Sequence, residues 1–577
     1  MIDYLPVKST ALTTAEAAHL LRRATMGPTQ AEITTFTGVS ADLAIQTLIN
    51  NINYLSSPPV DLNDTKTTVG QQYVNSSYNS VLARNFDFRY FYKHWWINIM
   101  TLQGGNPSIV DKLTLFWQNH FVITEAGVDE YRAIYQYFNL IRSGVVVNNV
   151  QRGGVLGNFR DMVYQISIDP AMLKYLNGND SVKGTPNENY ARELQELFVV
   201  GAKDFAGNNN YTENDVKAAA RVLTGWRYQN FYKNNTTSVY SDFTLSRHDT
   251  TQKVFSSNYA NTTISTPATI PPGYSNTGEF ELDALLNMLF NHPQTAKFIC
   301  RKLYRFFVNP NVTQVIEDTI IDQLATMFKT ADPITTRTFE IKPIIIKLLS
   351  SQHFYDVTNV GAMIKSPLEF TVGTYRFFNF NVPTIDTTNN TTLINTIKNH
   401  RYYAQYLYDR MNEMQMSILD QPTVFGYDAY YQTGYSRNWI NTTQVGLRNS
   451  FTDKLLTGYN VVSGNTPLVT LKMNMITTVD KPTTTTPYYD ASDPVAILDL
   501  VLKNVFAFDL TANQKAFLID TILLATLPRG NWTREWNTFK ATPITPVATY
   551  NANRKVVSDR LDRLMKYLFR MAEYHIC

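Results

Sequence analysis

The chain has 577 residues, of which 44% are hydrophobic and 17% are charged, so it is long enough to bury a large core without disulfides or metal ions. Its net charge is +3 and its basic residues are scattered, which argues against a binding surface for nucleic acid. Its two cysteines, Cys300 and Cys577, exclude a disulfide framework and do not have zinc-finger spacing.

The N-terminal segment lacks the features of a signal peptide. Its first 25 residues include Glu16, His19, Arg22 and Arg23, and no long apolar segment follows a basic start. No uncharged apolar run approaches the roughly 20 residues that a transmembrane helix needs. We therefore expect a soluble cytoplasmic protein without a transmembrane segment. Export to the periplasm or the surface, after removal of a leader that precedes residue 1, stays open.

Helix starts are frequent along the chain. In a capping box, a Ser or Thr and a Glu or Gln three residues later satisfy each other's backbone N–H groups. Such pairs are Thr13 with Glu16, Thr29 with Glu32, Thr511 with Gln514 and, more weakly, Thr212 with Asp215. Apolar residues repeat with a helical period in 281–290, 296–307, 316–328 and 341–350. These patterns predict a mainly α fold, a large bundle-like domain of many helices with few short strands.

Polar stretches rich in Asn, Thr and Tyr interrupt the helical patterns. They cover 51–80, 228–280, 381–395 and 460–492, and we expect long surface loops there. Apolar and polar residues alternate over 469–475, which predicts one strand. We expect a main helical domain over 1–490 and a C-terminal helical part, 491–577, packed on the same unit.

Nucleotide-binding loops, HExxH and GxSxG motifs are absent from the sequence, so its chemistry would fall to histidines and carboxylates. In the predicted helix that ends near residue 120, His120 continues the apolar face of Val110, Leu113 and Trp117 and should point inward. It is either a core histidine held by one hydrogen bond or a ligand or acid–base group.

A second motif lies in the predicted helix 186–198. Asn189, Glu193 and Glu196 form a polar stripe, and the two glutamates share a face at positions i and i+3. Such carboxylates repel each other and need a cation or a shared proton, unless water screens them. The alternative is a solvated face on which Arg192 pairs with Glu188.

A third motif lies in the long loop 228–280, where His248 and Asp249 are followed by Lys253 between aromatic residues. Loop residues held by a rigid scaffold often carry function. The alternative is a loop clasp in which Asp249 caps a turn and His248 is exposed.

These segments and several others occur in the order typical of one family. They are 17–28, 113–121, 169–176, 186–198, 216–226, 248–249, 285–308, 341–378, 439–441 and 573–577. On these motifs the chain resembles, over roughly residues 10 to 577, the bacterial family called domain of unknown function 1800.

The resemblance implies little chemistry, because no activity is established for the family. Its members are often encoded beside a second, exported family of unknown function, which implies a protein partner and envelope biology. Members commonly have histidines where this chain has Gln118 and Phe198. If those histidines are metal ligands in relatives, this chain has lost part of the set.

Two hypotheses follow. In the first, the protein is a non-catalytic binding or assembly protein of the bacterial envelope or cytoplasm, and its polar motifs are buried networks. In the second, it is a hydrolytic or oxidative enzyme with a site between helices. There His120, His248 and Asp249 would be catalytic. A divalent metal, if one is used, would be held by Glu193, Glu196, His120 and His248.

Overall fold

The structure is a computed structural model. It describes residues 2–52, 57–74, 81–102, 106–147, 150–233, 238–380, 384–430, 432, 434–463, 466–480 and 489–577. Within these ranges no helix combines the length and the apolar character that a bilayer-spanning segment requires.

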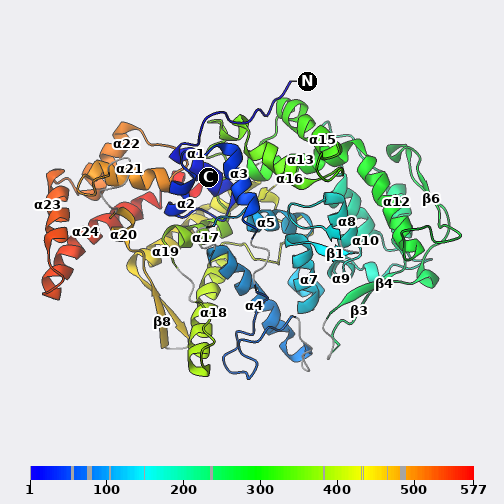
Figure 1. Cartoon of the computed structure of the whole chain (residues 1–577), viewed down its shortest axis with the longest axis horizontal. Coiled ribbons are helices and arrows are strands. Elements are labelled where there is room, and N and C mark those ends of the chain that lie inside the picture. The colour runs from blue at the N-terminus through cyan, green and yellow to red at the C-terminus, as the bar shows by residue number, and fades with distance from the viewer. Residues whose placement is uncertain are drawn as a thin grey trace.

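The protein is elongated and mainly α-helical, as predicted (Figure 1). Its first helices lie near the centre of the long axis, and the chain then runs towards one end. The elements of this part are α1 (Thr14–Ala24), α2 (Gln30–Phe36), α3 (Ala41–Asn50), α4 (Val81–Leu102), α5 (Val110–His120), α6 (Glu125–Val128) and α7 (Tyr131–Arg142).

The next part carries short helices and three antiparallel hairpins, and it forms the right-hand end of the molecule in Figure 1. Its strands are β1 (Val145–Val147), β2 (Val150–Arg152), β3 (Trp226–Gln229), β4 (Tyr240–Phe243), β5 (Lys253–Val254) and β6 (Thr263–Ile264). Its helices are α8 (Phe159–Ser167), α9 (Pro170–Tyr175), α10 (Glu188–Glu193), the π-helix η2 (Leu194–Val199), α11 (Glu213–Val222) and α12 (Thr277–Asn291).

The chain then returns through the centre. The elements there are α13 (Pro293–Phe307), α14 (Gln314–Ile316), the π-helix η5 (Glu317–Ile321), α15 (Asp322–Lys329), α16 (Ile341–Leu349), α17 (Pro367–Phe377), α18 (Asn390–Glu413), α19 (Thr442–Thr457), β7 (Tyr459–Ser463), β8 (Thr466–Leu471) and α20 (Met475–Val479).

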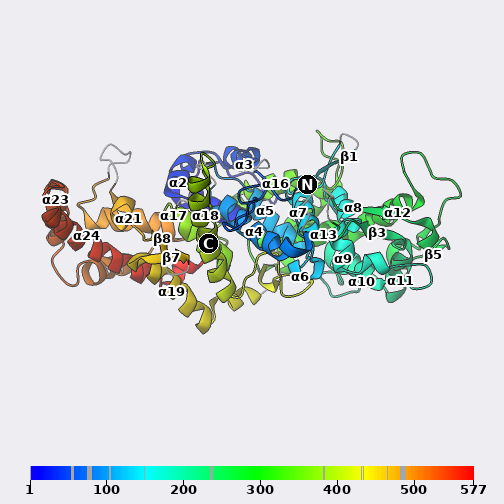
Figure 2. The same cartoon turned by 90° about the horizontal axis from the view of Figure 1, so that it is seen from below.

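The C-terminal helices form the opposite end of the molecule, as Figures 1 and 2 both show. They are α21 (Pro494–Val505), α22 (Ala512–Phe517), the π-helix η9 (Leu518–Leu523), α23 (Gly530–Ala541) and α24 (Val547–Leu568). After α24 the chain comes back to the centre, where Ile576 pairs with Ile364 and Cys577 donates its backbone N–H to Met363.

The predicted helix starts are confirmed. The four capping boxes are all formed. The structure adds a further cap, because Asp493 caps α21, which has Pro494 in its first turn. The four periodic ranges are helical, although the third is interrupted by η5. Two predictions were wrong in position. The loop expected over 381–395 extends too far, because α18 begins at Asn390. The strand expected at 469–475 runs over Thr466–Leu471, and the chain turns into α20 at Met475.

One contiguous hydrophobic core runs through the molecule. Its buried members extend from Leu5 to Tyr574, and a smaller cluster gathers around Phe88 of α4 and Tyr131 of α7. The predicted boundary at residue 490 stays a prediction. The core positions rigid helices around two polar regions, one at the end of α5 and one beside α12.

Candidate functional site

His120 is the last residue of α5 and points inward, as its place on the apolar face predicted. It is 3% exposed, and its Nε2 lies 2.9 Å from the carbonyl oxygen of Phe198. Its Nδ1 lies 3.0 Å from Nζ of Lys302 on α13. A carbonyl only accepts, so Nε2 carries the hydrogen and Nδ1 accepts from lysine. Burial, and secondly the charge of Lys302, hold the pKa of His120 well below its usual value.

Both partners of the pair also cap a helix end. The π-helix η2 ends at Val199, and its last carbonyl groups receive no hydrogen bond from an N–H group of the same helix. His120 donates to the carbonyl of Phe198, and Lys302 donates to that of Leu197 at 3.2 Å. A cation is favoured at this negative end of a helix. The wide turn at η2 therefore gives His120 and Lys302 a common anchor, and π-turns occur often at functional sites.

The pair faces a cavity of about 190 Å³, which we call the His120 cavity. Its charged lining residues are Glu196, Arg301, Lys302 and Arg305, and it also has an apolar side. Burial, and secondly the charge of Arg305, lower the pKa of Lys302 to about 7. Near neutral pH the amine is therefore present in both protonation states, which suits a group that binds or transfers protons.

Glu196 and Glu193 have different surroundings. Glu196 lines the His120 cavity and accepts a 2.7 Å hydrogen bond from the hydroxyl of Tyr211. Glu193 is half-buried, and burial, with the charge of Glu196 as the second cause, raises its pKa to about 7. The expected Arg192–Glu188 pair is present at 3.4 Å, so this helix combines a solvated edge with one carboxylate turned to the cavity.

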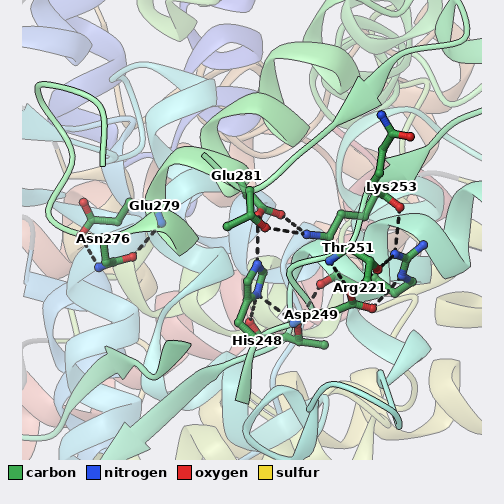
Figure 3. Close-up of polar contacts among 11 residues, drawn as sticks. Arg221, His248, Asp249, Thr251, Lys253, Asn276, Glu279 and Glu281 are labelled. Carbon is green, nitrogen blue, oxygen red and sulfur yellow. Dashed lines mark hydrogen bonds and ion pairs between the residues drawn. The ribbon is translucent and has the colours of Figure 1, made fainter. Parts of the chain in front are cut away.

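His248 belongs to a different, fully buried network beside α12, shown in Figure 3. Its Nδ1 lies 2.8 Å from the carbonyl of Thr224 and its Nε2 lies 3.0 Å from Oε1 of Glu281. Glu281 also accepts a 2.5 Å hydrogen bond from Nζ of Lys253, and the side chains of this trio have 0% exposure. Both ring nitrogens of His248 are therefore engaged by groups of this buried network rather than turned to a cavity.

Asp249 closes the loop next to this network. Its Oδ2 accepts a 2.8 Å hydrogen bond from Arg221, and its Oδ1 accepts one of 2.9 Å from the backbone N–H of Thr251 (Figure 3). Arg221 and Thr251 outweigh burial and hold the pKa of Asp249 far below its usual range. Asp249 thus caps a turn, as the clasp interpretation expected, whereas His248 is buried rather than exposed.

The four predicted metal ligands are not gathered at one point. Within the part of the chain that the structure describes, no group of three or more His, Cys, Asp or Glu side chains is placed to hold a metal ion. His120 and Glu196 share a cavity, whereas His248 binds Glu281 in the other network. Catalytic roles for His120, His248 and Asp249 stay predictions.

Sequence reasoning missed Lys302 and Glu281. One signal for Lys302 was present, because Arg301, Lys302 and Arg305 gather on one side of the predicted helix 296–307. Glu281 offered no such signal, because it meets His248 across 33 positions of chain. Only the packing of α12 against the loop brings those two side chains together.

Searches of the curated proteins and of the solved structures each found no match to this chain. One family model does match, over residues 19–575, and its description is "Protein of unknown function (DUF1800)". Because this match spans nearly the whole chain, the protein belongs to the DUF1800 family.

Proposed function

We propose that the protein binds a small organic anion in the His120 cavity. The observation that carries this proposal is the lining itself, in which three cationic side chains face one carboxylate. The cations are Arg301, Lys302 and Arg305, and the carboxylate is Glu196. Glu317 compensates Arg301 from behind through two hydrogen bonds of 2.9 and 2.6 Å, which leaves positive charge in excess.

The state of Lys302 supports an anionic ligand. An anion beside a buried ammonium favours its charged form and would raise the lowered pKa of Lys302 again. Binding should therefore take up a proton near neutral pH, because the free protein holds Lys302 only partly protonated.

The rest of the lining supports an organic ligand. Leu197, Phe298, Val424 and Phe425 contribute apolar surface, and the cavity has room for a ring or a short acyl chain. Ligand sites typically combine an apolar wall with a few polar groups that fix orientation. We therefore expect a carboxylate with an apolar body of modest size.

Isothermal titration calorimetry tests the proposal with benzoate, hexanoate and succinate, and with benzamide as the neutral match of benzoate. We expect binding of at least one carboxylate, no binding of benzamide, and proton uptake revealed by buffers of different ionisation enthalpy. Lys302→Met should weaken binding at least about tenfold. Lys515→Met, which removes a lysine paired with Asp499 and Asp509, should not. Carboxylate binding that Lys302→Met leaves unchanged, or no binding at all, would contradict the proposal.

A second candidate is an enzyme that uses the His120–Lys302 pair, and the pKa of Lys302 near 7 favours it. A buried lysine with a lowered pKa is a nucleophile for carbonyl compounds. The amine would add to a ketone or aldehyde and expel water. Trapping with pyruvate and borohydride, followed by peptide mass spectrometry, would favour this candidate if Lys302 gained the reduced adduct.

An assembly role with the neighbouring exported family also stays a proposal, as does the compartment. Co-expression with such a partner and size-exclusion chromatography would test it, because a stable complex elutes ahead of either protein alone.

A further inference from the structure

A second cavity lies where the N-terminal helix meets the C-terminal segment. It has about 40 Å³ of space, and we call it the Arg22 cavity. Arg22, Lys365, Thr374, Tyr574 and Cys577 are among its lining residues, which come from α1, α17, α21 and the segments beside them. It shares no lining residue with the His120 cavity. Figure 1 shows the C-terminus next to α1 at the centre of the molecule.

Among the described residues, the two cations that line the cavity donate hydrogen bonds to backbone carbonyls alone. Arg22 is 6% exposed and donates from Nη2 to the carbonyl of Asn504 at 2.7 Å, while its buried Nη1 has no partner among the described residues. Lys365 donates to the carbonyl of Tyr574 at 2.6 Å, and its ammonium lies 4.6 Å from the centre of that residue's ring.

Two more buried arginines stand behind the lining. Arg23 is 1% exposed and donates to Sγ of Cys577 at 3.8 Å and to the carbonyl of Val308. Arg448 is 0% exposed and donates to the carbonyl of Lys365 at 2.6 Å. Among the described residues, Nε and Nη1 of Arg448 and Nε of Arg23 have no hydrogen-bond partner.

No carboxylate within the described ranges forms an ion pair with any of these four cations at 4.0 Å or less. Glu369 also lines the cavity, but its carboxylate pairs with Lys112, so that pair is already neutral. The region therefore holds buried positive charge in excess. Other buried cations of the chain differ in this respect, since Arg132 pairs with Glu130 and Arg376 pairs with Glu32.

Buried charge without a counter-charge is unfavourable, and arginine cannot escape by losing its proton at neutral pH. Burial lowers the pKa of Lys365 to about 7, that of Arg22 to about 10 and that of Arg448 to about 9. Burial, followed by the charges of Arg448 and Lys365, also lowers the pKa of His575 to about 3. Burial raises the pKa of the Cys577 thiol, but the charges of Arg23, Lys112 and Lys365 outweigh burial and hold that pKa below its usual value. This thiol is the chain's own partial counter-charge, and it opposes four cations that form no ion pair with a carboxylate of the described residues.

We propose that the Arg22 cavity binds one small tetrahedral oxyanion, held by Arg22 and Lys365 and stabilised by Arg23 and Arg448 behind them. The cavity volume corresponds to roughly three or four water-sized positions, which suits an inorganic ion. The hydroxyls of Thr374 and Tyr574 also line the wall, but their hydrogens are already engaged, because Thr374 donates to the carbonyl of Phe370 at 2.7 Å and Tyr574 donates to Thr374 at 2.9 Å. The oxyanion would join α1 to α17 and to the C-terminal segment, and it would stabilise the folded chain.

The test uses the full chain with phosphate as the probe. Protein purified without phosphate or sulfate buffers is first unfolded, and the released anions are measured by ion chromatography. Thermal unfolding is then followed in sodium phosphate and in sodium chloride at matched ionic strength. We expect either about one released oxyanion per chain or a saturable rise of the unfolding temperature in phosphate alone. Neither released anion nor a rise specific to phosphate would overturn the proposal.

Variants locate the site. Arg22→Met and Lys365→Met should weaken phosphate binding at least about tenfold, because each removes a charged donor. Arg192→Met is the matched control, since Arg192 pairs with Glu213 on the surface, and it should bind phosphate like the wild type. Lys302→Met separates this site from the His120 cavity and should also keep the response. A phosphate response that Lys302→Met abolishes and Arg22→Met retains would overturn this proposal.

A last measurement distinguishes a free oxyanion from the head group of a larger ligand. Phenyl phosphate carries the same charged head on a ring that the cavity has no room for. We expect phenyl phosphate to give less than about a tenth of the affinity of free phosphate. If phenyl phosphate bound as well as phosphate and in an Arg22-dependent way, the head group of a larger ligand would be the occupant, and the assignment to a free ion would be wrong.

Discussion

Lys302→Met should remove a pH-dependent penalty on folding. Methionine retains the apolar stem and removes the ammonium group. Burial lowers the pKa of Lys302 from 10.5 to about 7 in the folded chain. Between these values the unfolded chain holds the proton and the folded chain releases it, so the free energy of unfolding rises with pH. Below the pKa of the folded chain, Lys302 is protonated in both states, so the folded state carries the full cost of burying the charged ammonium group.

The size of the effect follows from the two pKa values. Linkage gives a rise of about 3 kcal/mol in the free energy of unfolding between about pH 7 and about pH 9.5. Lys302 keeps part of its surface exposed, so solvent screening reduces this figure, and we expect about 1–3 kcal/mol. Lys365 titrates in the same pH range. Its contribution to the free energy of unfolding is the same in wild type and variant, so it cancels from the difference between the two proteins. The lowered pKa of His120 keeps that group below the window.

Urea denaturation at the two pH values measures the difference. The wild type should gain stability relative to Lys302→Met as the pH rises. Lys515→Met serves as the control, because ion pairs with Asp509 and Asp499 raise the pKa of Lys515 and keep it charged throughout. Parallel pH profiles of wild type and Lys302→Met would refute the reasoning, because they would mean that Lys302 has the same pKa in both states.

Three further outcomes are expected. Glu281→Leu should lower the free energy of unfolding by about 3–5 kcal/mol in urea, because it leaves the buried ammonium of Lys253 without its counter-charge. The double variant Glu281→Leu/Lys253→Met should lose less than the sum of the single losses, and additive losses would argue against a coupled pair. Thr511→Ala removes the capping box of α22 and should lower stability by about 1 kcal/mol in the same assay, whereas no change would mean that this helix end is frayed. Elemental analysis of untreated protein should find no stoichiometric transition metal, because Lys302 occupies the free nitrogen of His120; one equivalent of metal that His120→Ala abolishes would contradict this.

The helices were predictable because their signals are local. A capping box needs only two residues three positions apart, and the pair Thr13 and Glu16 forms one in the folded chain. The inward direction of His120 was predictable for the same reason, since a helical period places it with Trp117. The strand near residue 469 was misplaced because alternation over a few residues does not fix where a hairpin begins.

The partners of the histidines could not be predicted, because they depend on long-range packing. His120 and Lys302 meet across 182 positions of chain. The π-helix η2 was also invisible, since a widened turn leaves no clear signal in the pattern of apolar residues. That turn ends the regular spacing of Glu193 and Glu196, so an argument based on 100° per residue does not carry over to the second glutamate.

Positions 118 and 198, where the resemblance implies histidines in other members, do not have the same relation to His120. Gln118 lies two residues earlier on α5, and residues two apart on a helix do not face each other. The ring of Phe198, by contrast, lies 6.1 Å from the ring of His120. A histidine at position 198 would therefore adjoin His120, whereas one at position 118 would not. In this chain the Lys302 ammonium already binds the Nδ1 lone pair that a metal ion would need. The positive charge at this point is thus supplied by a side chain, and an anion can be recognised there without a metal.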